Sequence, residues 1–316
     1  LSALPSNMSA LINLRHLKAD TKLVSNIQGL ERLTALQELS VSGRKVRELA
    51  GMDMLKRLEI SDLDQIQSRE EAVQARLGVK EYLEVLELRW KDDRDEHSLN
   101  QTLEEEVLEG LQPAPDSIST LQVVGYGGVK SPSWMEGQLW ASCPLERVEL
   151  QNCRKWEVMP PLGQLRWLKF LAIRGMRRVR QIGSQFLSHS RNGGQSTGAV
   201  EVQGFPSLEE LEFTSMPEWE QWEVPIGDDP GQRQVQQQPS FLPRLRKLEI
   251  GECPKLRELP PLPPTLTRLV ISRVGLVRLP EWLRSRGGGG NFDEAPSSSS
   301  SSSSYSLSCL LSTARI

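Results

Sequence analysis

Hydrophobic residues recur along this chain in a short phrase, Leu-x-x-Leu-x-(Leu, Ile or Val), in which x is mostly polar. In the stretch 242–253, this phrase consists of Leu245, Leu248 and Ile250, followed by Cys253. The alternation in its second half predicts a short strand whose apolar residues point inward. Because such a strand cannot be stable alone, we expect the copies to stack in parallel and bury a ladder of leucines.

The phrase can be placed about ten times, at intervals of 19 to 40 residues. Its central residues are Leu17, Leu39, Leu58, Leu86, Leu121, Val148, Leu171, Leu211, Leu248 and Leu269. The shorter intervals are typical of leucine-rich repeats, which are about 20 to 29 residues long, and the longer ones indicate insertions. We therefore expect an α/β leucine-rich-repeat solenoid, an irregular horseshoe with one short parallel strand per repeat on its concave face and few helices.

The repeats define the domain organisation. We expect one solenoid over residues 1–283 and a disordered Gly/Ser-rich tail over 284–316. The expected insertions lie near 64–80, 91–115, 183–204 and 224–240. The chain starts without Met and within a repeat, which suggests a fragment whose N-terminal part is missing.

Two insertions carry helix signals. Residues 68–79 predict a short helix with acidic residues in its first turn. Residues 98–111 predict a second helix, with Ser98 and Gln101 as a capping box and Pro113 after its end. We expect the carboxylates of this helix, Glu104–Glu106, to be solvated.

The position three residues after the second inward strand residue holds Asn in ordinary repeats, where its side chain ties neighbouring turns together. In this chain it holds Arg44, Leu63, Lys91, Tyr126, Cys153, Met176, Met216, Cys253 and Val274. Asn is absent from this position, and the two cysteines can offer only a weak S–H hydrogen bond in its place. We expect Cys153 and Cys253 to have this structural role.

The composition and the motifs of the chain argue against nucleic-acid binding, membrane insertion, metal binding and catalysis. The net charge is −3, so there is no bulk attraction to nucleic acid or to an anionic membrane, and no apolar run is long enough to span a bilayer. Four cysteines without a paired spacing favour reduced thiols over zinc or a disulfide scaffold. No phosphate-binding loop or catalytic motif occurs. We expect a cytoplasmic protein that is not an enzyme and holds no cofactor.

The outward residues of the strands are the candidate functional surface. Five of the nine residues between the inward strand positions are Glu, beside a mixed and partly basic column. These charges either keep the surface soluble or form a protein-binding face. The candidate binding residues are Glu59, Glu87, Arg89, Trp90, Gln122, Glu149, Arg147, Phe170, Arg174, Glu212, Lys247, Glu249 and Arg268. Tryptophans that follow Pro by two residues either pack between repeats or anchor a partner.

The residues that are not leucine carry a resemblance to a known family. The stretch 83–135 contains Leu88-Arg89-Trp90, a helix end that reaches Pro113, Gly125-Tyr126 and Pro132-Ser133-Trp134. This pattern, together with 205–222 and 242–271, resembles the leucine-rich-repeat region of plant nucleotide-binding disease resistance proteins of the coiled-coil class. The resemblance covers roughly residues 1–283.

The resemblance implies a function. In such receptors the repeat region holds a nucleotide-dependent switch closed and senses a pathogen effector, directly or through a guarded host protein. The implied partners are therefore an effector, a host protein or the receptor's own nucleotide-binding domain. ATP or ADP is expected only in a switch domain that this sequence lacks. An alternative is a substrate adaptor or another interaction scaffold unrelated to immunity.

Overall fold

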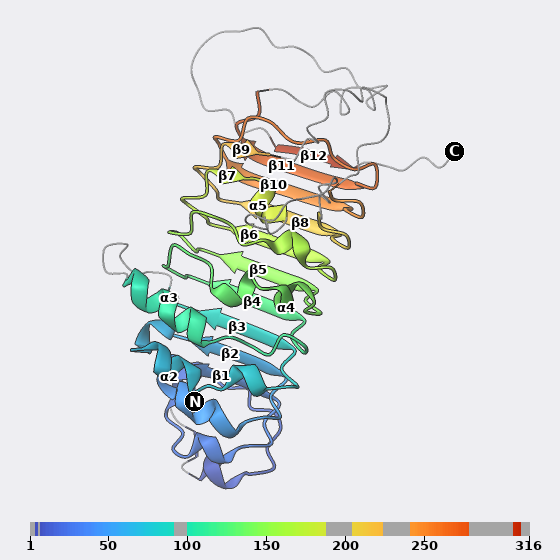
Figure 1. Cartoon of the computed structure of the whole chain (residues 1–316). Helices are drawn as coiled ribbons and strands as arrows, with labels where there is room; N and C mark the ends of the chain where they lie inside the picture. The colour runs from blue at the N-terminus through green and yellow to red at the C-terminus, as the bar shows by residue number, and fades with distance from the viewer. Residues whose placement is uncertain are drawn as a thin grey trace, which may run out of the picture.

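The computed structural model describes residues 4–5, 7–91, 100–187, 204–223, 241–277 and 306–310. Within them, nine parallel strands form one sheet, and their spatial order follows the chain (Figure 1). These strands are β1 Glu38–Ser42, β2 Arg57–Ser61, β3 Val85–Arg89, β4 Thr120–Val124, β5 Arg147–Gln151, β6 Phe170–Arg174, β8 Glu210–Thr214, β10 Lys247–Cys253 and β11 Arg268–Val274. The predicted leucine-rich-repeat solenoid is confirmed.

The ladder of leucines holds the strands in register. Leu39 lies opposite Leu58, which in turn lies opposite Leu86, and the same position is matched along the whole parallel sheet. All of these side chains are almost fully buried in one continuous core. The phrase at Leu17 is an exception, because there only a single bridge forms, between His16 and Glu38.

The segments that return from one strand to the next carry short helices and turns, which lie along one side of the sheet (Figure 1). The α-helices are α1 Thr21–Ser25, α2 Arg69–Val73, α3 Gln101–Gly110, α4 Gln138–Ala141 and α5 Ser184–Leu187. Two further strands, β7 Gln181–Ile182 and β9 Gln221–Trp222, pair in parallel as a second, two-stranded sheet. We call the side that carries these segments the return face.

The helices in the insertions begin close to where the sequence predicts. Ser68 caps α2, since its hydroxyl accepts a hydrogen bond from the amide of Glu71 at 3.3 Å. For α3 the capping residue is Asn100, whose side chain accepts from the Leu103 amide at 3.2 Å. The predicted cap Ser98 lies outside the described residues.

The expectation that the carboxylates of α3 are solvated is wrong for Glu104. This side chain is 4% exposed and accepts a hydrogen bond of 2.7 Å from the buried amide of Gly127. Glu105 accepts from the amide of Val129 at 2.9 Å. The acidic helix therefore fixes the loop that follows β4 by capping its backbone amides, a role that needs acceptor oxygens and buries one of the carboxylates.

Seven of the nine parallel strands share a turn near their C-terminal end. The residue just before the usual Asn position has a positive φ in seven repeats, and in five of them it is not glycine. These seven residues are Asp62, Gly125, Asn152, Gly175, Ser215, Glu252 and Arg273. The buried Cys253 follows this turn and donates to the Gly251 carbonyl at 3.2 Å, while Cys153 donates to that of Gln151 at 3.5 Å. Both thiols are thus buried and hydrogen-bonded within their own repeat, and the Cys153 thiol also reaches the Val123 carbonyl of the preceding repeat at 3.9 Å, which is the tie between turns that was predicted.

The C-terminal tail contains one described element. Strand β12, Ser306–Leu310, pairs with β11 and is the only antiparallel neighbour in the described sheet. The expectation that all of 284–316 is disordered is therefore wrong for these five residues, because their backbone satisfies the edge of β11. The rest of the tail lies outside the described residues, as do 226–240 and most of 183–204.

Candidate functional site

The outward side chains of the nine parallel strands form what we call the sheet face. The parallel register places Glu59 directly opposite Glu87, and Glu212 directly opposite Glu249. Like charges at such positions repel each other. The sheet therefore needs cations beside these carboxylates, and the next outward row supplies them.

The first cluster of charges lies on β2, β3 and β4. The Arg89 guanidinium is 3.3 Å from Glu59 and 3.1 Å from Glu87. Arg57 approaches Glu87 from the other side at 3.7 Å, and Arg89 also donates to the Gln122 side chain at 3.4 Å. One arginine thus bridges two glutamates that stand opposite each other on adjacent strands.

The second cluster repeats this arrangement on β5, β6 and β8. Arg174 donates two hydrogen bonds of 2.6 Å to Glu212 and a third of 3.1 Å to Glu149. Hydrogen bonding to Glu212 raises the pKa of the Arg174 guanidinium, against the opposing effect of burial. Such a two-pronged contact is geometrically specific, so Arg174 holds three strands in a defined charge pattern.

Beside this cluster, the Arg147 guanidinium lies over the Phe170 ring, 3.7 Å from the ring centroid. Arg147 also donates to Glu149 at 3.1 Å, and its side chain is 45% exposed. An arginine stacked on a ring offers both a planar donor and apolar surface. Arg and aromatic residues are also the types enriched at binding hot spots.

The remaining predicted residues lie apart from these two clusters. On β10, Lys247 is 3.8 Å from Glu210 and 3.5 Å from Glu249. Arg268 on β11 is exposed and forms no ion pair with a described residue. The structure thus distributes the predicted set over most of the sheet face and concentrates contacts at Arg89 and Arg174.

Trp90 was predicted on this surface, and that prediction is wrong. The side chain is 3% exposed, and its ring centroid is 5.3 Å from that of Tyr126. The residue continues the inward alternation of Leu86 and Leu88, so the period of the strand places it in the core. Trp167, in contrast, is 56% exposed, although most described tryptophans pack between repeats.

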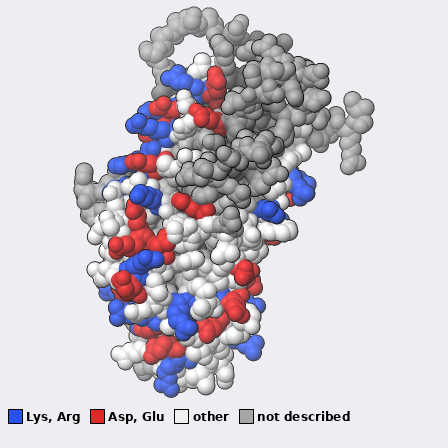
Figure 2. Space-filling view, viewed as in Figure 1, with Lys and Arg blue, Asp and Glu red and all other residues white. Residues whose placement is uncertain are grey.

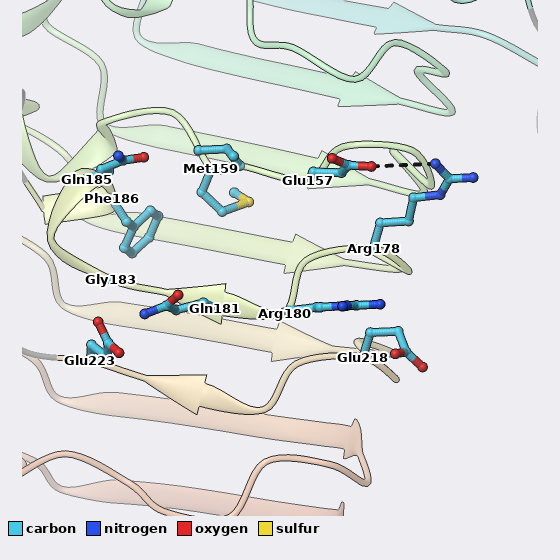
Figure 3. Close-up of a pocket in the computed structure, with 11 residues that line it drawn as sticks. Glu157, Met159, Arg178, Arg180, Gln181, Gly183, Gln185, Phe186, Glu218 and Glu223 are labelled. Atoms are coloured by element: carbon cyan, nitrogen blue, oxygen red, sulfur yellow. Dashed lines mark ion pairs between the residues drawn. The ribbon is translucent and has the colours of Figure 1, made fainter.

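A second candidate site is a cleft of about 770 Å³ on the return face. Figure 3 shows Arg178, Arg180 and Glu218 at one end of this cleft and Gln185 and Glu223 at the other. The predicted binding residues did not include these side chains. The basic run 177–180, which has three arginines in four residues, was the signal that could have identified them.

The electrostatic character of the described surface is mixed. On the side shown in Figure 2, acidic and basic side chains are interspersed and form no extended patch of one sign. Among the described residues, no group of His, Cys, Asp or Glu could hold a metal ion. No helix in the described part of the chain has the length and apolarity that crossing a bilayer requires.

Stacked parallel strands with a buried leucine ladder and short return segments define a leucine-rich-repeat protein. Residues 46–176 match the family model for R13L1/DRL21 leucine-rich repeats. This part of the chain is therefore similar to the repeats of that family, and three plant proteins named as disease resistance proteins are similar to the chain as well.

The disease resistance RPP13-like protein 1 of Arabidopsis thaliana is 31% identical over 74% of this chain and 21% of its own length. The disease resistance protein At3g14460 of the same plant is 32% identical over 75% of the chain and 16% of its length. RGA4 of Solanum bulbocastanum, a disease resistance protein by name, is 29% identical over 62% of the chain and 19% of its length. The chain thus spans about a fifth of the length of these relatives.

Among solved structures, one chain in "Crystal structure of Rad7 and Elc1 complex in yeast" aligns with 76% of this chain and 71% of its own length. The TM-score is 0.29 and the identity 13%, which is too weak a likeness to carry an argument.

Proposed function

We propose that this chain is a sensor and regulatory region in plant defence that acts by binding protein through its sheet face. Its partners are the nucleotide-binding domain of a resistance receptor, a pathogen effector or a guarded host protein. On this proposal the chain is cytoplasmic and performs no catalysis, and ATP or ADP is bound only by a separate switch domain.

The observation that carries this proposal is the Arg147–Phe170 stack beside the Arg174 cluster. Most outward charges are already paired on the sheet face, so a partner gains little from them. The exposed guanidinium and the half-buried ring combine apolar area with a planar donor at the middle of the surface. This combination favours a protein partner over a small ligand, which would need an enclosed pocket.

The pairing of the charges also decides how the proposal is tested. Reversing Glu87, Glu149, Glu212 and Glu249 together would break the clusters that hold the sheet face, so loss of binding would not report on binding alone. The substitution Phe170→Ala, combined with Arg147→Ala, removes the stack and leaves the Arg174–Glu212 bonds in place.

The assay is co-precipitation in leaf cells. The chain is co-expressed with the tagged nucleotide-binding segment expected in RPP13-like protein 1, and recovery is normalised to the amount of soluble chain. We expect the wild-type chain to be recovered and the double variant to lose at least about tenfold, since hot-spot residues each contribute about 2 kcal/mol or more. The matched control, Arg244→Ala in the exposed loop before β10, should bind as the wild type does. Failure to recover the wild type, or equal recovery of the double variant, would refute binding of this domain through the sheet face.

A further inference from the structure

The return-face cleft has features that the sheet face does not share. It spans three successive return segments, which contribute Met159, Gln181 and Glu223 to its lining. Its floor includes the buried Phe186, while most of its other lining residues are charged or carry amides. A volume of about 770 Å³ is within the range of ligand sites, but this polar lining is unlike an ordinary apolar pocket.

One wall of the cleft is the free edge of the small sheet formed by β7 and β9. The amides of Glu220 and Gln221 donate to the Arg180 carbonyl at 2.8 and 3.3 Å, and that of Glu223 donates to the Ile182 carbonyl at 2.8 Å. Backbone groups of successive strand residues point to opposite edges, so the N–H and C=O of Gln181 point away from β9. Among the described residues, no strand pairs with that edge.

The cleft also has room at this edge. Figure 3 shows the segment with Glu157 and Met159 on the side of β7 opposite to β9, and residues of both segments line the cleft. The cleft volume of about 770 Å³ leaves room for a short extended segment, which would lie about 4.8 Å from β7 as a neighbouring strand does. An unpaired strand edge is a template for such an addition.

The charges at the two ends of the cleft define what would fit. Glu157 pairs with Arg178 at 3.5 Å, and Glu218 pairs with Lys255 at 2.6 Å. The hydrogen bond from Lys255, and to a lesser extent the charges of Lys255 and Arg180, lower the pKa of Glu218.

After these pairings, one positive and one negative side chain are left without an ion pair among the described residues. Arg180 acts on Glu218 through its charge but forms no ion pair there, and Glu223 at the opposite end forms no ion pair there either. The cleft therefore presents a positive end and a negative end along one open strand edge.

We propose that the return-face cleft binds an extended protein segment as a third strand on β7, with an acidic side chain beside Arg180 and a basic one beside Glu223. Backbone hydrogen bonds to Gln181 supply part of the affinity, and the two charged ends select the sequence. This surface is separate from the sheet face, so the proposal does not rest on the defence function.

The probe is a fluorescein-labelled pentapeptide, Glu-Val-Thr-Val-Lys, whose terminal side chains are about 13 Å apart when it is extended. Its binding to the full chain is followed by fluorescence anisotropy. Two matched peptides replace both charged residues with Gln or carry N-methylated central amides. Two matched protein variants reverse one charge each, Arg180→Glu in the cleft and Arg244→Glu outside it.

We expect N-methylation and Arg180→Glu each to weaken binding by about tenfold, as is typical for the loss of a strand pairing or of a charge-assisted contact. The Gln peptide should bind more weakly than the charged one, and Arg244→Glu should bind as the wild type does. The proposal is overturned if the N-methylated peptide binds equally well, if both charge reversals act alike, or if no binding occurs up to about 1 mM peptide. A dimer of the free chain in light scattering that dissociates on Arg180→Glu would also overturn it, because the edge would then bind a second copy.

Discussion

Replacing Arg174 with Met tests whether the charge clusters hold the sheet face together. The Arg174 side chain is 33% exposed, while Glu149 and Glu212 are 19% and 16% exposed. The substitution keeps the aliphatic part of the side chain but removes three hydrogen bonds. It also leaves two glutamates on the strands either side of β6 without their shared cation.

The expected loss of stability on Arg174→Met follows from the partial exposure of Arg174 and its two glutamates. A fully exposed ion pair contributes about 0.2–1 kcal/mol, whereas a hydrogen bond to a charged group contributes about 1.5–3 kcal/mol when desolvated. Because solvent screens these groups in part, we expect Arg174→Met to lower the free energy of unfolding by about 1–2 kcal/mol. This corresponds to a fall of about 0.5 M in the urea midpoint, for a slope of about 2–3 kcal/mol per M.

Urea unfolding followed by circular dichroism measures this change, and the double substitution Arg174→Met with Glu212→Gln completes a thermodynamic cycle. We expect a coupling of about 1 kcal/mol or more between the two residues, reduced in 1 M NaCl. Arg166→Met, at an exposed position with no ion pair to a described residue, should change stability by less than about 0.5 kcal/mol. A coupling indistinguishable from zero would show that the bridging arginine does not hold the strands.

Three further outcomes are expected. Glu104→Ala leaves the buried Gly127 amide without its acceptor and should lower the free energy of unfolding by about 1–3 kcal/mol. Glu104→Gln retains an acceptor and should lower it less. Equal effects of the two substitutions in thermal unfolding would contradict the capping role. Burial raises the pKa of the Cys143 thiol to about 12 and that of the Cys253 thiol to about 11. Iodoacetamide at pH 8 should therefore label both thiols slowly in the folded chain and readily in urea. Equal labelling rates in the two conditions, measured by mass spectrometry, would disprove this. Trp156→Ala empties a fully buried site and should cost about 3–5 kcal/mol in the same unfolding assay, whereas a cost under about 1 kcal/mol would mean that the repeats repack around it.

The leucine phrase predicts the register of the sheet because it reports on a local property, the alternation of buried and exposed positions. Leu58, Leu86 and Leu171 all occupy the inward position that their spacing indicates. The same alternation predicts an inward Trp90, two residues after Leu88, although Trp90 was included among the predicted binding residues. Periodicity was the better guide there, since it is a physical constraint on the backbone.

The contacts among charged residues could not be predicted in the same way. The sequence placed Glu149, Arg174 and Glu212 on one face, but Arg174 and Glu212 are 38 residues apart in the chain. Which arginine bridges which glutamates depends on a diagonal offset between neighbouring strands. Glu104 illustrates the same limit, because its acceptor role depends on a loop 23 residues further along.

The direct pairing of β6 with β8 has a consequence for how such a surface can change. Leu171 lies opposite Leu211 even though about 40 residues separate them, so the long return segment between them leaves the strand register intact. A return segment of this length is therefore compatible with the same register of the outward residues as a short one. A single chain can thus present two surfaces that diversify independently, one by changing side chains and the other by changing the length of the loops.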